Sequence, residues 1–205
     1  MAKSKPDHSA IGRRSKRKGK TYERRCAKIL TEFTGINFRP TPASGGFNKQ
    51  GVTIREELFC GDLICDSPNF RFCIEAKNRE EFSFTALLKK PQTAAFTKWW
   101  WQCTDDAQRV GLFPLLFFKP DNNADFVVMT KDQFLDICPQ VPAFILDIYD
   151  GPMTIKVTKD RVKQEVTVTL PTPVVMDWKQ FVSHCDPGVM FNAMLRSREN
   201  EKKRG

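Results

Sequence analysis

Residues 58–78 read LFCGDLICDSPNFRFCIEAKN, and their pattern is the most informative in the chain about its architecture. This stretch holds two runs typical of β-strands, 58–65 and 70–78, on either side of the turn-forming sequence DSPN at 66–69. We predict from this pattern that the two runs pair as an antiparallel hairpin.

Alternation along the second strand separates an apolar side from a polar one. The apolar side carries Phe70, Phe72, Ile74 and Ala76. The other side carries Arg71, Cys73, Glu75 and Lys77. Glu75 and Lys77 therefore share a face, with backbones about 6.6 Å apart. Asp62 lies on the partner strand, where Gly61 has no side chain and permits close approach. Two carboxylates and an amine are thus predicted to face one another.

Two carboxylates beside an ammonium group suit a metal site that cleaves phosphodiesters. A divalent cation held by oxygen ligands neutralises charge at phosphorus and lowers the pKa of the attacking water. Asp62 and Glu75 are the predicted ligands, and Lys77 would orient or deprotonate the water. On spacing alone, an exposed strand face with a Glu–Lys pair is the commoner explanation. The flanking elements and the basic ends of the chain favour the metal site.

Outside this stretch the pattern alternates between helices and strands. We predict a helix from Tyr22 that ends at Gly35, a helix from Pro91 to Arg109, and a strand at 112–118 covered on both faces. Further strands are predicted at 126–129, 144–149, 154–159 and 162–170, with the last two as a hairpin. Two further helices are predicted: one is capped by Thr130 and Gln133 and runs through Cys138, and the other is capped by Asp177.

Positive charge lies at the two ends of the chain. The net charge is +9, of which residues 1–20 carry +7 and residues 196–205 carry +3, so the body at 21–195 carries −1. Basic ends on a nearly neutral body favour contacts with the phosphates of a polyanion, with solubilising tails as the alternative. The predicted DNA-binding residues are Arg13, Arg14, Lys16, Arg17, Lys18 and Lys20.

Several classes of protein are excluded by composition. The longest apolar run, 111–118, is shorter than the roughly 18 residues of a membrane span. The string GKT at 19–21 lacks the preceding glycine and strand of a nucleotide-binding loop, so we expect no nucleotide cofactor. Seven cysteines, an odd number, sit mostly among apolar residues and indicate a reducing cytosol. The sequence has two histidines, so it offers few ligands for a tetrahedral zinc site. A metal knuckle formed by Cys60 and Cys65 is the alternative.

Three consecutive tryptophans mark the 91–109 helix. Trp99 and Trp100 fit its buried stripe, whereas Trp101 faces the opposite side. An exposed aromatic is costly unless something covers it, so we predict that a partner subunit or the core covers Trp101. Stacking on DNA bases is the alternative.

The segment 19–120 resembles the PD-(D/E)XK nuclease superfamily, and within it the Holliday junction resolvases of archaea and phages. The resemblance rests on GKTYERR at 19–25, GDL at 61–63, IEAK at 74–77 and PLLFFK at 114–119. It implies a restriction-endonuclease-like α/β core of order α-β-β-β-α-β, with a mixed central sheet flanked by helices. It also implies dependence on Mg²⁺, with Mn²⁺ as a substitute, and homodimers that nick a four-way DNA junction in pairs.

The resemblance assigns individual roles as well. The implied metal ligands are Asp62, Glu75 and the backbone carbonyl of Ala76, and the implied catalytic residues are Lys77, Glu23 and Ser44. An acidic residue placed for the helix dipole explains Glu23 equally well. The glycines after Ser44 also fit a mobile loop that contacts DNA or an inert turn.

The expected organisation is a disordered basic arm at 1–18, a nuclease core at 19–138, C-terminal strands and a helix packed on the core at 139–195, and a basic tail at 196–205. The expected function is resolution of DNA junctions in the cytoplasm, that of a bacterial host if a phage encodes the protein. A restriction or repair nuclease of the same fold is one alternative, and a non-catalytic DNA-binding protein is the other.

Overall fold

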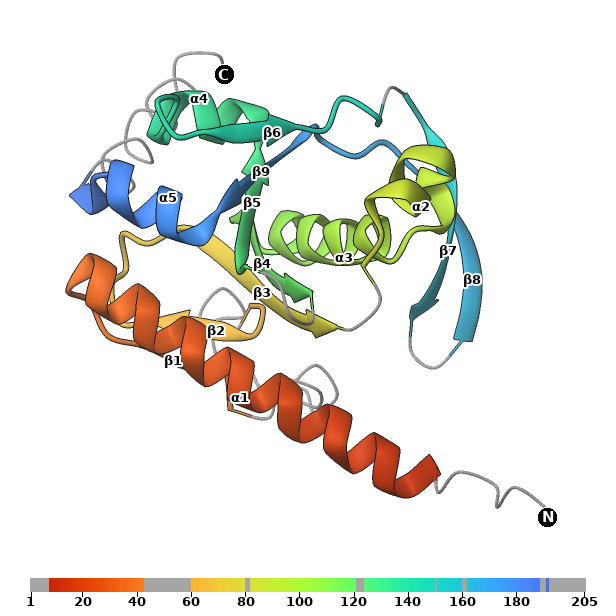
Figure 1. Ribbon diagram of the computed structural model, residues 1–205, viewed down its shortest axis with the longest axis horizontal. Coiled ribbons are helices and arrows are strands. Elements are labelled where there is room, and N and C mark those ends of the chain that lie inside the picture. The colour runs from red at the N-terminus through yellow and green to blue at the C-terminus, as the bar shows by residue number, and fades with distance from the viewer. Residues whose placement is uncertain are drawn as a thin grey trace.

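Figure 1 shows the computed structural model of the protein, a mixed β-sheet with helices on both faces. The structure describes residues 8–42, 60–79, 82–120, 124–149, 151–159, 162–188 and 191. The predicted α/β class with a mixed central sheet flanked by helices is confirmed. No helix within these ranges is long and apolar enough to cross a membrane.

Five strands form the central sheet in the order β3-β4-β5-β9-β6. Their bounds are Phe72–Arg79 (β3), Phe113–Pro120 (β4), Phe126–Thr130 (β5), Pro173–Asp177 (β9) and Ala143–Ile145 (β6). β3 and β4 are parallel, and the other neighbours are antiparallel. β3 therefore forms one edge of the sheet, which leaves its outer side open for other contacts.

Helices cover both faces of this sheet. One face carries three helices: α1 (His8–Thr34), α4 (Lys131–Ile137) and α5 (Trp178–His184). The other face carries the helices α2 (Phe84–Lys89) and α3 (Ala95–Arg109), and the hairpin of β7 (Met153–Lys159) and β8 (Val162–Val168). β4 lies between the two layers, because Leu115 and Phe117 pack toward α1 while Leu116 and Phe118 pack toward α3. The prediction of a strand covered on both faces is confirmed.

The predicted hairpin across the turn at 66–69 is wrong. β2 (Leu63–Cys65) pairs antiparallel with β1 (Phe38–Pro40) in a separate two-stranded sheet. Gly61, two residues before β2, makes a parallel bridge with Ile74 of β3. The segment that carries the candidate site therefore reaches β3 in the opposite direction from the one we predicted.

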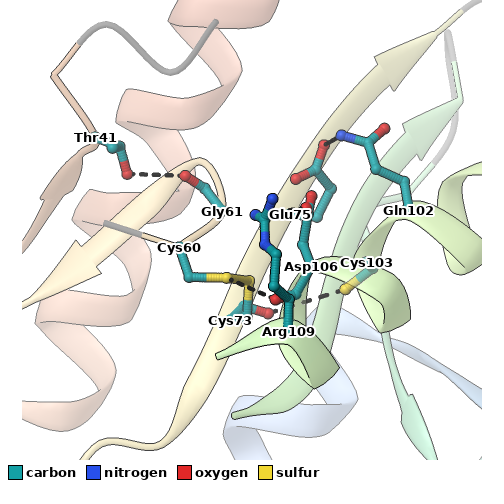
Figure 2. The surroundings of a disulfide bond; sticks show 9 residues. All are labelled: Thr41, Cys60, Gly61, Cys73, Glu75, Gln102, Cys103, Asp106 and Arg109. Carbon is teal, nitrogen blue, oxygen red and sulfur yellow. Dashed lines mark hydrogen bonds and ion pairs between the residues drawn. A yellow bond between two sulfur atoms is a disulfide. The ribbon is translucent and has the colours of Figure 1, made fainter. Parts of the chain in front are cut away.

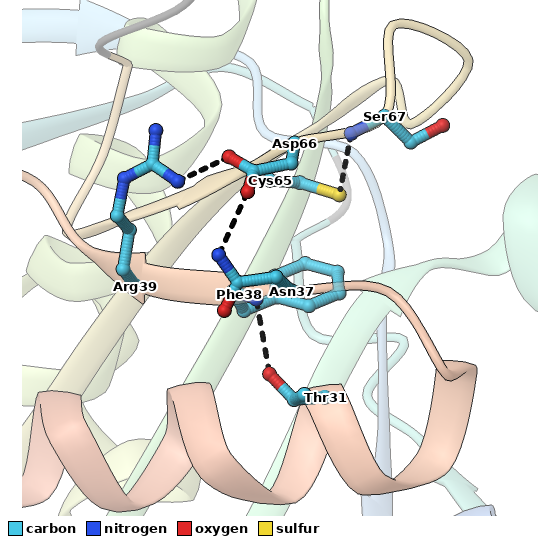
Figure 3. Close-up of polar contacts among 7 residues, drawn as sticks. All are labelled: Thr31, Asn37, Phe38, Arg39, Cys65, Asp66 and Ser67. Atoms are coloured by element: carbon cyan, nitrogen blue, oxygen red, sulfur yellow. Dashed lines mark hydrogen bonds and ion pairs between the residues drawn. The ribbon is translucent and has the colours of Figure 1, made fainter.

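Contacts of Asp66 accompany the pairing of β2 with β1, as Figure 3 shows. The Asp66 carboxylate accepts a hydrogen bond of 2.7 Å from Asn37 Nδ2 and pairs with the guanidinium of Arg39. The backbone N–H of Phe38 in turn donates to Thr31 Oγ1 of α1 at 3.0 Å. These contacts tie β2 to β1 and β1 to α1, and they join residues too distant in sequence for a local turn pattern to reveal.

α1 begins earlier than predicted. We expected order near Gly19, but the helix starts at His8 and includes most of the basic arm at 1–18. Once the buried half of a helix is anchored, adding further residues requires no new nucleation, so basic helix-forming residues extend it. The predicted end is confirmed, because Gly35 adopts a positive φ of 71° directly after Thr34.

The second predicted helix is divided in two. A 3-10 turn, η3 (Pro91–Thr93), precedes α3, and Ala94 between them has extended backbone at φ −64° and ψ 142°. α2 was not predicted; Ser83 caps it by accepting from the backbone N–H of Ala86. α3 ends at Arg109 as expected. With α2 and η3 inserted, the first elements otherwise follow the predicted α-β-β-β-α-β order.

The C-terminal part contributes to the sheet itself. The capping box of Thr130 with Gln133, the Asp177 cap and the β7–β8 hairpin are confirmed. β9 was not predicted, yet it lies between β5 and β6. β6 and β9, which follow the expected boundary at 138, therefore belong to the same hydrogen-bonded sheet as β3, β4 and β5.

Trp101 is covered within the chain. It is half-buried and packs against the apolar cluster on the α3 side, together with Met153 and Val168 of the β7–β8 hairpin. This placement confirms the core alternative and removes the need for a partner subunit at that position.

Candidate functional site

The candidate site lies on the outer edge of β3 and on the face that α3 covers. Glu75 is buried, with 3% of its surface exposed, and Lys77 donates to its Oε1 atom. Gln102 of α3 donates to the same oxygen from Nε2 at 3.0 Å, as Figure 2 shows. The predicted sharing of one face by Glu75 and Lys77 is thus confirmed. α3 turns that face into a buried environment rather than an exposed one.

Asp62 lies beside Glu75 along the edge of β3. Its backbone N–H donates to the carbonyl of Ile74 at 2.7 Å, and its Oδ2 accepts from the backbone N–H of Ala76 at 3.0 Å. Side chain and backbone therefore both fix Asp62 on β3. The carbonyl of Ala76 points to the same edge, because the N–H and C=O of one strand residue share a side.

Gly61 permits this close approach. Its φ of 74° is in the left-handed region, and a Cβ atom placed there would lie 2.3 Å from the carbonyl oxygen of Ile74. Buried Thr41 supports the same turn: its Oγ1 donates to the carbonyl of Gly61, and its N–H donates to that of Asp62, both at 2.9 Å. Figure 2 shows Thr41 reaching Gly61. The expected close approach at Gly61 is confirmed, and its partner is backbone.

A disulfide joins Cys60 to Cys73 next to the site, with the Cα atoms 5.5 Å apart (Figure 2). Cys60 directly precedes Gly61, and Cys73 lies two residues before Glu75. The bond holds the Asp62 segment against β3, and it excludes the alternative in which Cys60 and Cys65 form a metal knuckle. Cys26, Cys103, Cys138 and Cys185 are free and buried, as expected of small apolar core residues.

Burial and neighbouring charge shift the acid–base properties of this pair. Burial, followed by the negative charge of Asp62, raises the pKa of Glu75 to about 8 against the lowering effect of Lys77. Burial alone lowers the pKa of Lys77, but the carboxylates of Glu75 and Asp62 outweigh it and raise that pKa above its usual value. A cation beside Glu75 would relieve the cost of holding this buried carboxylate.

Glu23 of α1 lies next to this centre. Burial and the negative charge of Asp62 raise the pKa of Glu23, while the positive charges of Lys20 and Lys77 lower it. Glu23 therefore interacts electrostatically with Asp62 and Lys77 of the site. Yet no group of three or more His, Cys, Asp or Glu side chains in the described ranges is arranged to hold a metal ion. Glu23 therefore does not form such a three-residue group with Asp62 and Glu75.

The remaining predicted residues have different outcomes. Lys18 is half-buried, whereas Arg13, Arg14, Lys16, Arg17 and Lys20 are exposed. They lie on the N-terminal half of α1, which extends past the sheet in Figure 1. Ser44 lies outside the described residues. Sequence reasoning missed Thr41 and Gln102, although a polar residue beside the buried stripe of α3 is a signal that could have identified Gln102.

The donor set fits a hard divalent cation. Asp62 has Oδ1 and Glu75 has Oε2 in addition to the oxygens already hydrogen-bonded, and the carbonyl of Ala76 lies on the same edge. Mg²⁺ accepts such oxygen ligands and keeps further positions for water and substrate. When bound, the cation would activate water and neutralise charge on the phosphate. Asp62, Glu75 and Ala76 would hold it, and Gln102 would fix the orientation of Glu75.

Comparison with known proteins agrees with this arrangement. Residues 14–192 match the family described as "Phage putative PDDEXK endonuclease". The match spans most of the chain, so the chain belongs to this family and is a nuclease of the PD-(D/E)XK superfamily. It is also similar to Protein D14 of Escherichia phage T5, with 27% identity over 124 residues that make up 60% of this chain and 75% of the T5 protein. No solved structure matches it.

The raised pKa of Glu75 predicts that metal binding strengthens with pH. Below about pH 8 the carboxyl is protonated, so a divalent cation must displace a proton. We expect the half-saturating Mg²⁺ concentration to fall by up to about tenfold per pH unit until about pH 8, and then to level off. Calorimetric Mg²⁺ titration at several pH values measures this. A constant affinity between about pH 6 and 8 would contradict the coupling of metal binding to the protonation of Glu75.

Proposed function

We propose that the protein is a metal-dependent, structure-specific DNA endonuclease that resolves four-way junctions by paired nicks. The observation that carries the proposal is the placement of Asp62, whose carboxylate accepts from the N–H of Ala76 directly beside buried Glu75. Two oxygen ligands and the amine of Lys77 then meet at one strand edge. This is the composition that metal-assisted phosphodiester hydrolysis requires.

Each residue has a defined part in this proposal. Asp62, Glu75 and the carbonyl of Ala76 hold Mg²⁺, or Mn²⁺ in its place, beside the scissile phosphate. Lys77 uses its Nζ to orient the attacking water or to stabilise the charge that develops. Gln102 keeps Oε1 of Glu75 in position, so the other oxygen of Glu75 faces the metal. Glu23 contributes negative charge next to Asp62 rather than a ligand.

The state of assembly and the location follow from the same proposal. Paired nicks on opposite strands need two active centres, so the active form is a homodimer on branched or duplex DNA. The basic residues of α1 contact phosphates, and their exposure supports this role. The similarity to a phage protein supports action in the cytoplasm of a bacterial host.

Labelled substrates test the proposed activity. The purified protein is incubated with a four-way junction, a linear duplex and single strands, with and without Mg²⁺ or Mn²⁺. We expect symmetric nicks in the junction that require the metal. Cleavage of linear duplex alone would favour a restriction or repair nuclease of the same fold. Binding without cleavage in either metal would favour a non-catalytic DNA-binding protein.

A further inference from the structure

The β7–β8 hairpin presents a wholly polar outer face. Ile155 and Val157 are buried against the rest of the molecule, so the intervening residues point outward. The outward cross-strand pairs are Thr154 with Thr167, Lys156 with Glu165, and Thr158 with Lys163, and all six residues are exposed. Such a face has no apolar surface to bury against a protein partner, but it is rich in hydroxyl and amine donors.

A hollow between this hairpin and α3 gathers positive charge. Lys98 of α3 lines it together with Lys156, Lys163 and Glu165 of the hairpin, alongside Thr158 and Gln164. Residues 153–168 contain four Lys or Arg and two Asp or Glu, a net charge of +2, whereas the body at 21–195 as a whole carries −1. The rest of the body therefore carries −3, so the hairpin is more basic than the average of the body.

The hollow is close to the candidate active site. Lys98 precedes Gln102 by four residues on α3, so the two side chains share a helix face about 6 Å apart. Gln102 donates to Glu75 at 3.0 Å. This separation of about 6 Å corresponds to roughly two nucleotides along one DNA strand, at about 3.4 Å per nucleotide. In the view of Figure 1, the end of β3 lies between the basic half of α1 and the hairpin.

We propose that the outer face of the β7–β8 hairpin, with Lys98, binds the phosphodiester backbone of the DNA beside the cleavage site. This inference rests on the proposed nuclease function and assigns part of its substrate contact. Lys, Thr and Gln side chains are donors that contact phosphate oxygens in DNA complexes. In this arrangement α1 and the hairpin contact the DNA on either side of the cleavage site. The residues of β3 then lie at the reacting phosphate between these two contacts.

The salt dependence of binding tests this contact. Lys156→Ala/Lys163→Ala protein is titrated with a fluorescently labelled junction and duplex in Ca²⁺ at a series of salt concentrations. Each lost phosphate contact reduces the slope of log affinity against log salt by about 0.9, so we expect a reduction of about 1 to 2 and roughly tenfold weaker binding. The matched control is Lys131→Ala/Lys179→Ala, which removes two exposed lysines from α4 and α5 on the other face of the sheet. We expect the wild-type slope from this control.

A second variant changes the charge in the opposite direction. Glu165→Gln removes the one acidic side chain that lines the described hollow, so we expect tighter binding and a steeper slope. Equal slopes for the hairpin and control variants, or no change for Glu165→Gln, would overturn the proposal. Because binding is measured without cleavage, a reduced slope would support the hairpin contact even if wild-type protein cut no DNA.

Discussion

Replacing Asp62 with Asn or Glu75 with Gln is expected to abolish DNA cleavage while DNA binding persists. Each change removes one charged oxygen ligand but keeps the size of the side chain. The fold should tolerate Asp62→Asn, because the amide keeps one oxygen, which suffices to accept from the N–H of Ala76. A bound metal contributes several kcal/mol to the transition state, and about 1.4 kcal/mol corresponds to tenfold in rate. We therefore expect a loss of about 10³-fold or more in cleavage.

Two measurements separate loss of chemistry from loss of fold. Single-turnover cleavage of the junction gives the rate, and calorimetric titration with Mg²⁺ gives the metal affinity of each variant. Matched controls are Asp132→Asn on α4 and Glu32→Gln on α1, whose exposed carboxylates lie away from the site. We expect both controls to cut DNA at the wild-type rate. Full cleavage by Asp62→Asn or Glu75→Gln protein would remove that residue from the metal site.

Gly61→Ala is expected to have the second large effect, through position rather than charge. The new Cβ would lie 2.3 Å from the carbonyl oxygen of Ile74, so the Asp62 segment must move away from β3. The movement breaks the hydrogen bond from Asp62 N to Ile74, and the left-handed φ adds about 1–2 kcal/mol of strain. With about 1 kcal/mol for this hydrogen bond, the free energy of unfolding should fall by about 2–3 kcal/mol.

The rate of cleavage should fall as well as stability in Gly61→Ala protein. A displacement on the order of 1 Å at a catalytic group costs about 10²-fold in rate. Gly35→Ala is the matched control: its φ of 71° is also left-handed, but nothing lies within 4 Å of the added Cβ. Urea unfolding and cleavage well below the melting temperature compare the two. Equal destabilisation by both substitutions, with full cleavage, would show that the approach of Gly61 to Ile74 is not required.

Local patterns in the sequence were enough to place the two residues at the centre of the site. Alternation along β3 puts Glu75 and Lys77 on one face, and the hydrogen bond between them confirms it. Gly35 correctly marked the end of α1, and Thr130 with Gln133 correctly marked the start of α4. Caps, turns and periodicity involve neighbours within a few residues, so the chain encodes them where they occur.

Tertiary structure decided how Asp62 reaches Glu75. The turn at 66–69 is typical of a hairpin, yet β2 pairs with β1, where Phe38 and Leu63 are buried in the core, and Gly61 bridges β3 in parallel. Gln102, the Cys60–Cys73 disulfide and the insertion of β9 into the sheet are likewise contacts between distant segments. Local sequence patterns predicted the three side chains that we propose for the site, Asp62, Glu75 and Lys77. Only packing of the whole chain decided their direction of approach and their burial, because those depend on surfaces that local patterns do not describe.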